Sequence, residues 1–62
     1  MEFYREYIDD GKILATERLN IDVKHNPQWK SEVCGYSVYD GNSTIILVRW
    51  VGLGVNTFKE ND

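Results

Sequence analysis

The 62-residue sequence predicts a small all-β domain, with about five short strands in two hairpins plus a C-terminal strand. The sheet would curl or close into a small open barrel. Three observations predict this class. Two Asp-Gly dipeptides, Asp10-Gly11 and Asp40-Gly41, are of the kind that tight hairpin turns prefer. Both lie between runs rich in aromatic and β-branched residues. Leu19–Val23 alternates apolar and polar residues with the period of a half-buried strand.

The first hairpin is expected to begin with the strand Glu2–Ile8, which is rich in aromatic residues. Asp10-Gly11 would form its two-residue loop, because glycine accepts a positive φ freely and aspartate tolerates it. Ile8 would then pair with Ile13. The return strand would run on through Leu19–Val23, with a bend or bulge to fit so small a domain.

An α+β fold with residues 13–22 helical is the alternative. This segment contains Ala, Glu, Arg and Leu, which are good helix formers, and Leu14, Arg18 and Ile21 would share one stripe. The strand is favoured because Asp-Gly precedes it and because the alternation continues to Val23. Asn26-Pro27 then ends the element, since proline lacks a backbone donor and restricts its predecessor.

The second hairpin is expected to join Glu32–Tyr39 to Thr44–Val51 through a loop centred on Gly41-Asn42. This loop would pair Tyr39 with Thr44 and make both faces of the hairpin largely apolar. The face with Cys34, Tyr36, Val38, Ile45, Leu47 and Val51 would pack on the first hairpin. The other face is expected to contact a partner chain through Val33, Tyr39, Ile46, Val48 and Trp50.

The C-terminal segment is expected to complete one single domain, residues 1–62. Gly52 and Gly54 permit a sharp turn, after which Val55 and Phe58 could fold back onto the sheet. Residues 59–62 are expected to be frayed, as exposed chain ends usually are.

Charge and composition exclude several classes of protein. The net charge is −3, and acidic and basic residues are interspersed, so nucleic acid is an unfavoured partner. The longest apolar run, Ile45–Val48, is too short to span a membrane, and the N-terminus has no signal-peptide pattern. With one cysteine no intramolecular disulfide is possible, which fits a reducing cytoplasm.

No residue set in the sequence predicts an enzyme, a metal site or a cofactor site. Cys34 and His25 lie on either side of the proline break without a catalytic signature, and Cys34 is expected to be a small buried residue. Asp9 and Asp10 are better explained by the turn than by cation binding. Gly52-Leu53-Gly54 lacks the third glycine of a phosphate-binding loop.

These observations predict a non-enzymatic protein that masks a surface of a target protein. In size and composition the chain is similar to small inhibitor or accessory proteins of phages and mobile elements. Its partner would be a protein of unknown identity, and a homodimer is a further option. The alternative is a small β-barrel that binds a nucleotide or single-stranded nucleic acid through aromatic residues flanked by Lys or Arg.

Overall fold

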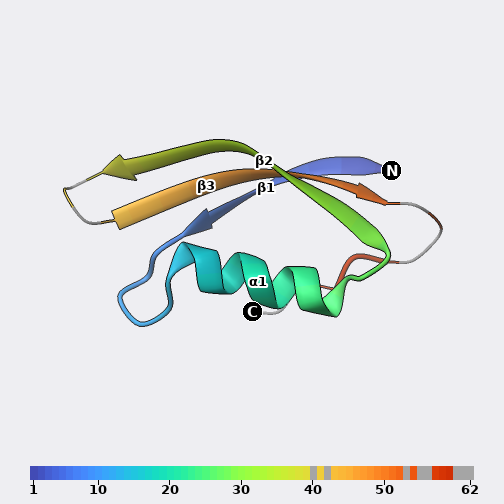
Figure 1. The fold of residues 1–62 in the computed structure, drawn as a ribbon, viewed down its shortest axis with the longest axis horizontal. Helices are drawn as coiled ribbons and strands as arrows, with labels where there is room; N and C mark the ends of the chain where they lie inside the picture. Colours follow the sequence, from blue (N-terminus) through green and yellow to red (C-terminus); the bar gives the residue numbers. More distant parts are fainter. Residues whose placement is uncertain (40, 42, 53, 55–56, 60–62) are drawn as a thin grey trace.

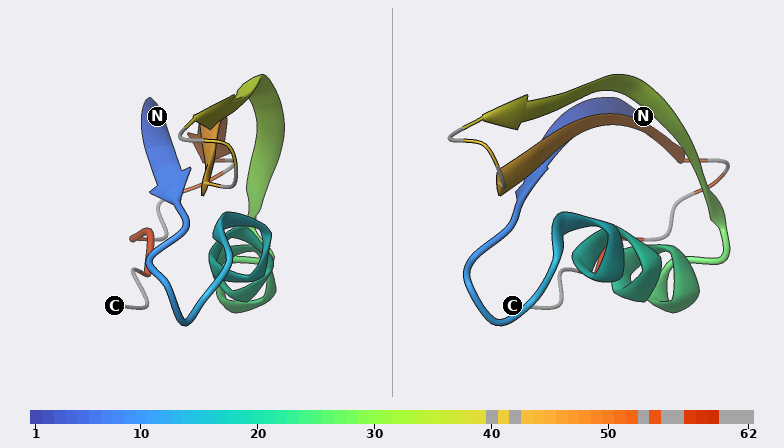
Figure 2. Two further views of the ribbon diagram at one scale, coloured as in Figure 1. Left: turned by 90° about the vertical axis from the view of Figure 1, so that its left-hand side faces the viewer. Right: turned by 60° about the vertical axis from the view of Figure 1, so that its left-hand side comes forward.

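A computed structural model describes residues 1–39, 41, 43–52, 54 and 57–59. These residues form three strands and one helix: β1 (Glu2–Ile8), α1 (Ala15–His25), β2 (Trp29–Tyr39) and β3 (Ser43–Gly52). The strands make one antiparallel sheet in the order β1-β3-β2, so the last of the three described strands is the central one (Figure 1). The sheet arches over α1, which lies on its concave side (Figure 2).

The fold is mostly β, but the predictions of five strands and of a barrel are wrong. The segment that follows Asp10-Gly11 is the helix α1, and not a return strand. Strand β1 therefore has no hairpin partner of its own and pairs with β3, from Glu2 opposite Val51 to Ile8 opposite Ile45. The sheet stays open, with β1 and β2 as its two edges. After Gly52 the described residues contain no strand.

Two aspartates explain why a helix follows the first Asp-Gly dipeptide. Asp10 Oδ1 accepts hydrogen bonds from the N–H groups of Lys12 at 3.4 Å and Ile13 at 3.1 Å, which closes a local turn. Asp9 Oδ1 accepts from the N–H of Ala15, the first helical residue, at 2.6 Å. One free donor at the helix N-terminus is thereby satisfied, and the carboxylate faces the positive end of the helix dipole.

The helix has a sheet-facing stripe with an unusual composition. Ala15, Leu19 and Asp22 recur at the spacing of one helix face, Asn26 follows directly after the last helical residue, and all four are buried or partly buried. Two of these positions are polar, so the apolar periodicity that indicates a helix is broken. The alternation within Leu19–Val23 was consequently the stronger local signal, and it predicted the wrong element.

The second hairpin is confirmed, but its register differs from the predicted one by one residue. Tyr39 lies opposite Ser43, so the loop contains three residues, 40–42. Tyr36 consequently lies opposite Ile46, and Val38 opposite Thr44. A shift of one residue moves every side chain of a strand to the other face. Tyr36 and Val38 therefore belong to the concave face, the face that carries the core.

The hydrophobic core lies between the sheet, α1 and the segment around Phe58. Its buried members are Tyr7, Ala15, Trp29, Ile46, Val48 and Trp50, with Phe3, Leu19 and Phe58 packed against them. Trp29 lies directly over Gly52, where an added Cβ would come within 2.9 Å of the indole ring. Gly52 thus serves close packing. Val55 and residues 60–62 lie outside the described residues, so the predictions for them remain open. No described helix has both the length and the hydropathy needed to cross a bilayer.

Candidate functional site

The five residues predicted to form an interface have different locations in the structure. Ile46, Val48 and Trp50 are buried in the core of this chain. Val33 is exposed, and the side chain of Tyr39 lies outside the described part of the structure. Three of the five therefore have no surface to offer a partner while the domain is folded.

A different set of apolar side chains is exposed on β2. Val33, Tyr36 and Val38 have exposed fractions of 56%, 64% and 53%. They lie opposite Val48, Ile46 and Thr44, and paired residues of neighbouring strands point to the same side of a sheet. We call these three residues the β2 strip. The strip continues the core to the edge of the sheet, where no side chain of the described residues covers it.

The packing of α1 explains why the strip is open. The helix packs mainly against β1 and β3, while β2 forms the far edge of the sheet. A bulge between Val33 and Gly35 then brings Val33 and Tyr36 to the same face, although they are three residues apart. Without the extra residue that the bulge adds to β2, strict alternation would place Val33 and Tyr36 on opposite faces.

The backbone of β2 adds a second feature to this surface. Within the described residues, β2 pairs only with β3, so the main-chain groups along its other side have no strand beside them. An edge strand of this kind is a template for pairing with another chain. Cys34 lies in the bulge and is exposed, with its Sγ 3.6 Å from the carbonyl oxygen of Glu32. The prediction that Cys34 is buried is therefore wrong.

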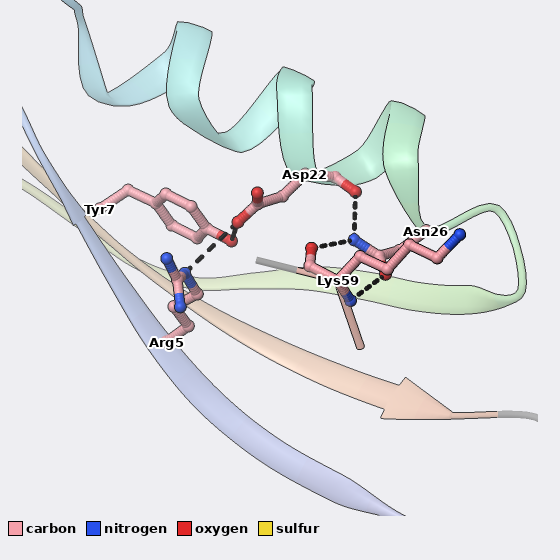
Figure 3. A network of polar contacts seen from close by, with 5 residues as sticks. All are labelled: Arg5, Tyr7, Asp22, Asn26 and Lys59. Atoms are coloured by element: carbon pink, nitrogen blue, oxygen red, sulfur yellow. Dashed lines mark hydrogen bonds and ion pairs between the residues drawn. The ribbon is translucent and has the colours of Figure 1, made fainter. Parts of the chain in front are cut away.

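A buried polar network holds the other edge of the sheet to α1 (Figure 3). Asp22 is 1% exposed, and its Oδ2 accepts a hydrogen bond of 2.5 Å from the Tyr7 hydroxyl. The same oxygen lies 3.3 Å from Nε of Arg5. The guanidinium of Arg5 also lies over the ring of Tyr7, 5.4 Å from its centre. A buried carboxylate requires such partners, because an isolated buried charge is strongly unfavourable.

Burial and the neighbouring carboxylate of Asp22 raise the pKa of the Tyr7 hydroxyl well above its usual value of about 10. The phenol is protonated at neutral pH, as an ordinary tyrosine is, and donates its hydrogen bond to Asp22. Beside the network is a cavity of about 240 Å³, lined by Arg5, Tyr7, Ile8, Asp9, Arg18 and Asp22 among others. Of the charged side chains that line it, Arg5 pairs with Asp22, Arg18 pairs with Asp10, and Asp9 accepts hydrogen bonds from backbone N–H groups. The network thus links α1 to β1 through the contacts of Asp22 with Tyr7 and Arg5.

Two of the arginines, Arg18 and Arg49, do not lie on a common binding surface. Arg49 lies on the convex face, where its Nε is 2.6 Å from Glu2 Oε2 and its Nη1 is 3.7 Å from Glu32 Oε1. Arg18 lies on the helix and pairs with Asp10. A single-stranded nucleic acid needs a continuous positive groove, and the ion pairs neutralise these arginines on opposite sides of the sheet. The alternative prediction of a nucleic-acid-binding barrel gains no support from this arrangement.

The residues with metal-binding or nucleophilic chemistry are dispersed. Among the described residues, no group of three or more His, Cys, Asp or Glu side chains could hold a metal ion. His25 ends α1 and lines a cavity with Pro27 and Trp29, whereas Cys34 lies midway along β2. Comparison with protein-family models, curated proteins and solved structures finds no match to this chain.

Sequence reasoning placed Tyr36 and Val38 against the first hairpin, and the structure exposes both on the β2 strip. The missing information was the length of the loop, since a three-residue connection would have put both residues on the face of Ile46. Three-residue hairpin loops with a glycine at positive φ are common, and Gly41 has a φ of 79°. Gly41 fits this three-residue loop as well as it fits the loop of residues 40–43 that the predicted pairing of Tyr39 with Thr44 implies.

Proposed function

We propose that this protein binds another protein through the β2 strip and the open edge of β2. The observation that carries the proposal is the exposure of three large apolar side chains on one edge strand. An apolar patch beside unpaired main-chain groups favours a protein partner, since it offers both hydrophobic burial and backbone hydrogen bonds. The chain would act on its partner by masking the surface that it covers.

The chemistry of this surface indicates the kind of partner. An added strand would form hydrogen bonds to the edge of β2 and project alternate apolar side chains toward Tyr36 and Val38. Tyrosine is enriched among the residues that dominate binding energy, and Tyr36 is the largest side chain of the strip. We therefore expect a target protein with an extended segment whose alternate residues are apolar.

Substitutions in the strip test this proposal. The tagged protein captures a partner from a lysate of its source organism, and calorimetry then measures the affinity of that partner for purified variants. Tyr36→Ala and Val38→Asp should each weaken binding by at least about tenfold, as expected for residues that dominate an interface. Both side chains are exposed, so the free energy of unfolding should change by no more than about 0.5 kcal/mol.

Tyr4→Ala is the matched control. Tyr4 is 57% exposed, close to the value of Tyr36, but it lies on β1 at the opposite edge and pairs with Arg49 of the convex face. Its substitution should change the affinity by less than about threefold. Equal losses for Tyr4→Ala and Tyr36→Ala, or no loss for either strip variant, would reject the strip as the interface. Analytical ultracentrifugation of the isolated protein shows whether the strip instead joins two copies of the chain.

A further inference from the structure

The short segment Thr57–Lys59 is held to the end of α1 by a single buried amide. Asn26 is 4% exposed, and its Nδ2 donates a hydrogen bond of 2.9 Å to the carbonyl oxygen of Lys59. Its Oδ1 accepts one of 2.7 Å from the N–H of the same residue. Figure 3 shows both bonds, together with the third, from Nδ2 to the carbonyl oxygen of Asp22 at 2.8 Å. The amide thus pairs with one residue of the segment as a neighbouring β-strand would.

The residue before Lys59 inserts an aromatic ring among three others. The ring centre of Phe58 lies 5.0 Å from that of Phe3, 5.4 Å from Trp29 and 4.7 Å from Trp50. All three contacts are edge-to-face, the geometry in which the positive edge of one ring meets the negative face of another. We call Phe3, Asn26, Trp29 and Trp50 the aromatic pocket.

The hydrogen bonds of Asn26 to Lys59 and the packing of the Phe58 ring are the two kinds of contact by which proteins recognise an extended peptide. Main-chain hydrogen bonds supply affinity that does not depend on sequence, and a side-chain pocket supplies the sequence preference. Both hydrogen bonds between Asn26 and Lys59 involve main-chain atoms of Lys59 and not its side chain. Any residue other than proline could therefore take the place of this lysine. The ring of Phe58 is the feature that a competing segment would have to reproduce.

The segment leaves space beside the aromatic pocket. A cavity of about 380 Å³ remains open there, lined by His25, Asn26, Pro27, Gln28, Trp29, Thr57 and Lys59. A longer or bulkier segment that formed the same two contacts could also fill this cavity. Residues Thr57–Lys59 therefore cover only part of the surface that a bound peptide could bury.

We propose that the aromatic pocket is an exchangeable peptide-binding site, which the chain fills with its own residues Thr57–Lys59. The ligand in trans would be an extended segment of a partner protein that presents a phenylalanine followed by a residue with free N–H and C=O groups. This site is separate from the β2 strip, and binding there does not depend on the function proposed above. The covalently attached segment competes at a high effective concentration, so exchange requires a partner segment with additional contacts.

The test uses the full chain with Phe58→Ala, which empties the ring position and leaves Asn26 in place. The probe is the acetylated and amidated peptide Asn-Thr-Phe-Lys-Glu, and tryptophan fluorescence reports its binding next to Trp29 and Trp50. We expect a dissociation constant on the order of 0.1–1 mM for so small a ligand. Binding to the parent chain should be at least about tenfold weaker, because its own segment occupies the pocket.

Three controls separate specific exchange from non-specific binding of the peptide. The peptide with alanine in place of phenylalanine should bind Phe58→Ala at least about tenfold more weakly, since the ring supplies most of the buried apolar area. The double variant Asn26→Ala/Phe58→Ala should lose about tenfold as well, through the two main-chain hydrogen bonds. Val38→Asp combined with Phe58→Ala should bind the peptide unchanged, because Val38 belongs to the β2 strip.

Circular dichroism decides the case in which Phe58→Ala is poorly folded. If the peptide at millimolar concentration restores the spectrum of the parent chain, then the pocket accepts a ligand in trans and the proposal holds. If the variant is folded and shows no binding, or is unfolded and not restored by the peptide, then the pocket is only part of the core. Equal binding of the phenylalanine and alanine peptides would also overturn the proposal.

Discussion

The two Asp-Gly dipeptides of this chain share one backbone feature but precede different elements. Gly11 and Gly41 have φ angles of 85° and 79°, the left-handed region that glycine enters without steric cost. The chain after Gly11 becomes the helix α1, whereas the chain after Gly41 becomes the central strand β3. The dipeptide therefore predicted a positive φ correctly at both positions, but it predicted the following element at only one.

The difference comes from the residues on either side of each glycine. Before Gly11, Asp9 and Asp10 direct their carboxylates toward backbone N–H groups farther along the chain, those of Lys12, Ile13 and Ala15. After Gly41, a long run of β-branched and aromatic residues has a neighbouring strand to pair with. A turn signal thus marks where the chain reverses, and capping groups and the next segment decide what forms afterwards.

Removal of the helix cap should have the largest effect on this comparison. Asp9→Ala deletes the acceptor of Ala15 N–H and also that of Thr44 N–H, which Asp9 Oδ2 binds at 3.1 Å. We expect a loss of about 2 kcal/mol in the free energy of unfolding, roughly 1 kcal/mol for each main-chain donor left without its partner. Urea unfolding followed by far-ultraviolet circular dichroism measures it. Asp9→Asn keeps part of the acceptor capacity, so its loss in the free energy of unfolding should be smaller. If Asp9→Ala left the free energy of unfolding unchanged, the hydrogen bonds of Asp9 would be unimportant for stability.

Substitution of the two glycines should have a smaller effect that is equal at the two turns. Gly11→Ala and Gly41→Ala should each cost about 1 kcal/mol, because an L-residue is disfavoured at positive φ. An added Cβ would meet nothing within 4 Å at either site, so backbone strain is the only cost. Gly35→Ala is the control, since Gly35 is in a strand and its added Cβ would make an ordinary contact at 3.6 Å. Unequal losses in the free energy of unfolding, measured in parallel urea titrations, would show that the two turns differ in more than the element that follows each of them.

The smallest effect concerns the pH dependence of Asp10. The backbone N–H of Ile13, then Arg18 and then the N–H of Lys12 hold the pKa of the Asp10 carboxyl below its usual range. A carboxyl with a lowered pKa stabilises the fold above its unfolded pKa of about 4, and this contribution is lost as the pH falls through the folded pKa. The difference in unfolding free energy between the parent and Asp10→Asn should therefore be small at pH 7 and vanish near pH 2. A difference that grew on acidification would contradict this sign.

Local patterns in the sequence were sufficient to locate the three strands of the sheet. Glu2–Ile8 was predicted with its observed bounds, and the other two strands extend only slightly beyond the predicted ones. Alternation and β-branched composition are properties of short segments, so a single sequence contains them. The folding back of Phe58 onto the sheet was also anticipated from Gly52 and Gly54.

The topology and the candidate interface depended on information that short segments do not contain. Asp22 of α1 and Asn26, which follows the helix, are both buried. Tyr7 and Arg5 bind the carboxylate of Asp22, and Lys59 binds the amide of Asn26. Neither polar residue suggests a buried stripe until its partners, distant in sequence, are known. The placement of Tyr36 and Val38 depended on a single residue of loop length, and an error of one in register moved both to the opposite face.

The central position of β3 in the sheet has a consequence for the time course of folding. Strand β1 is synthesised before β2 and β3, yet within the described sheet it pairs only with β3, the latest of the three, with Glu2 opposite Val51. The β2–β3 hairpin is local and closes on the microsecond timescale, whereas the docking of β1 must bring together residues at least as far apart as Ile8 and Ile45, with α1 and β2 in the loop between them. The described sheet can therefore be completed only after β3 has been synthesised, because β1 has no other described strand to pair with.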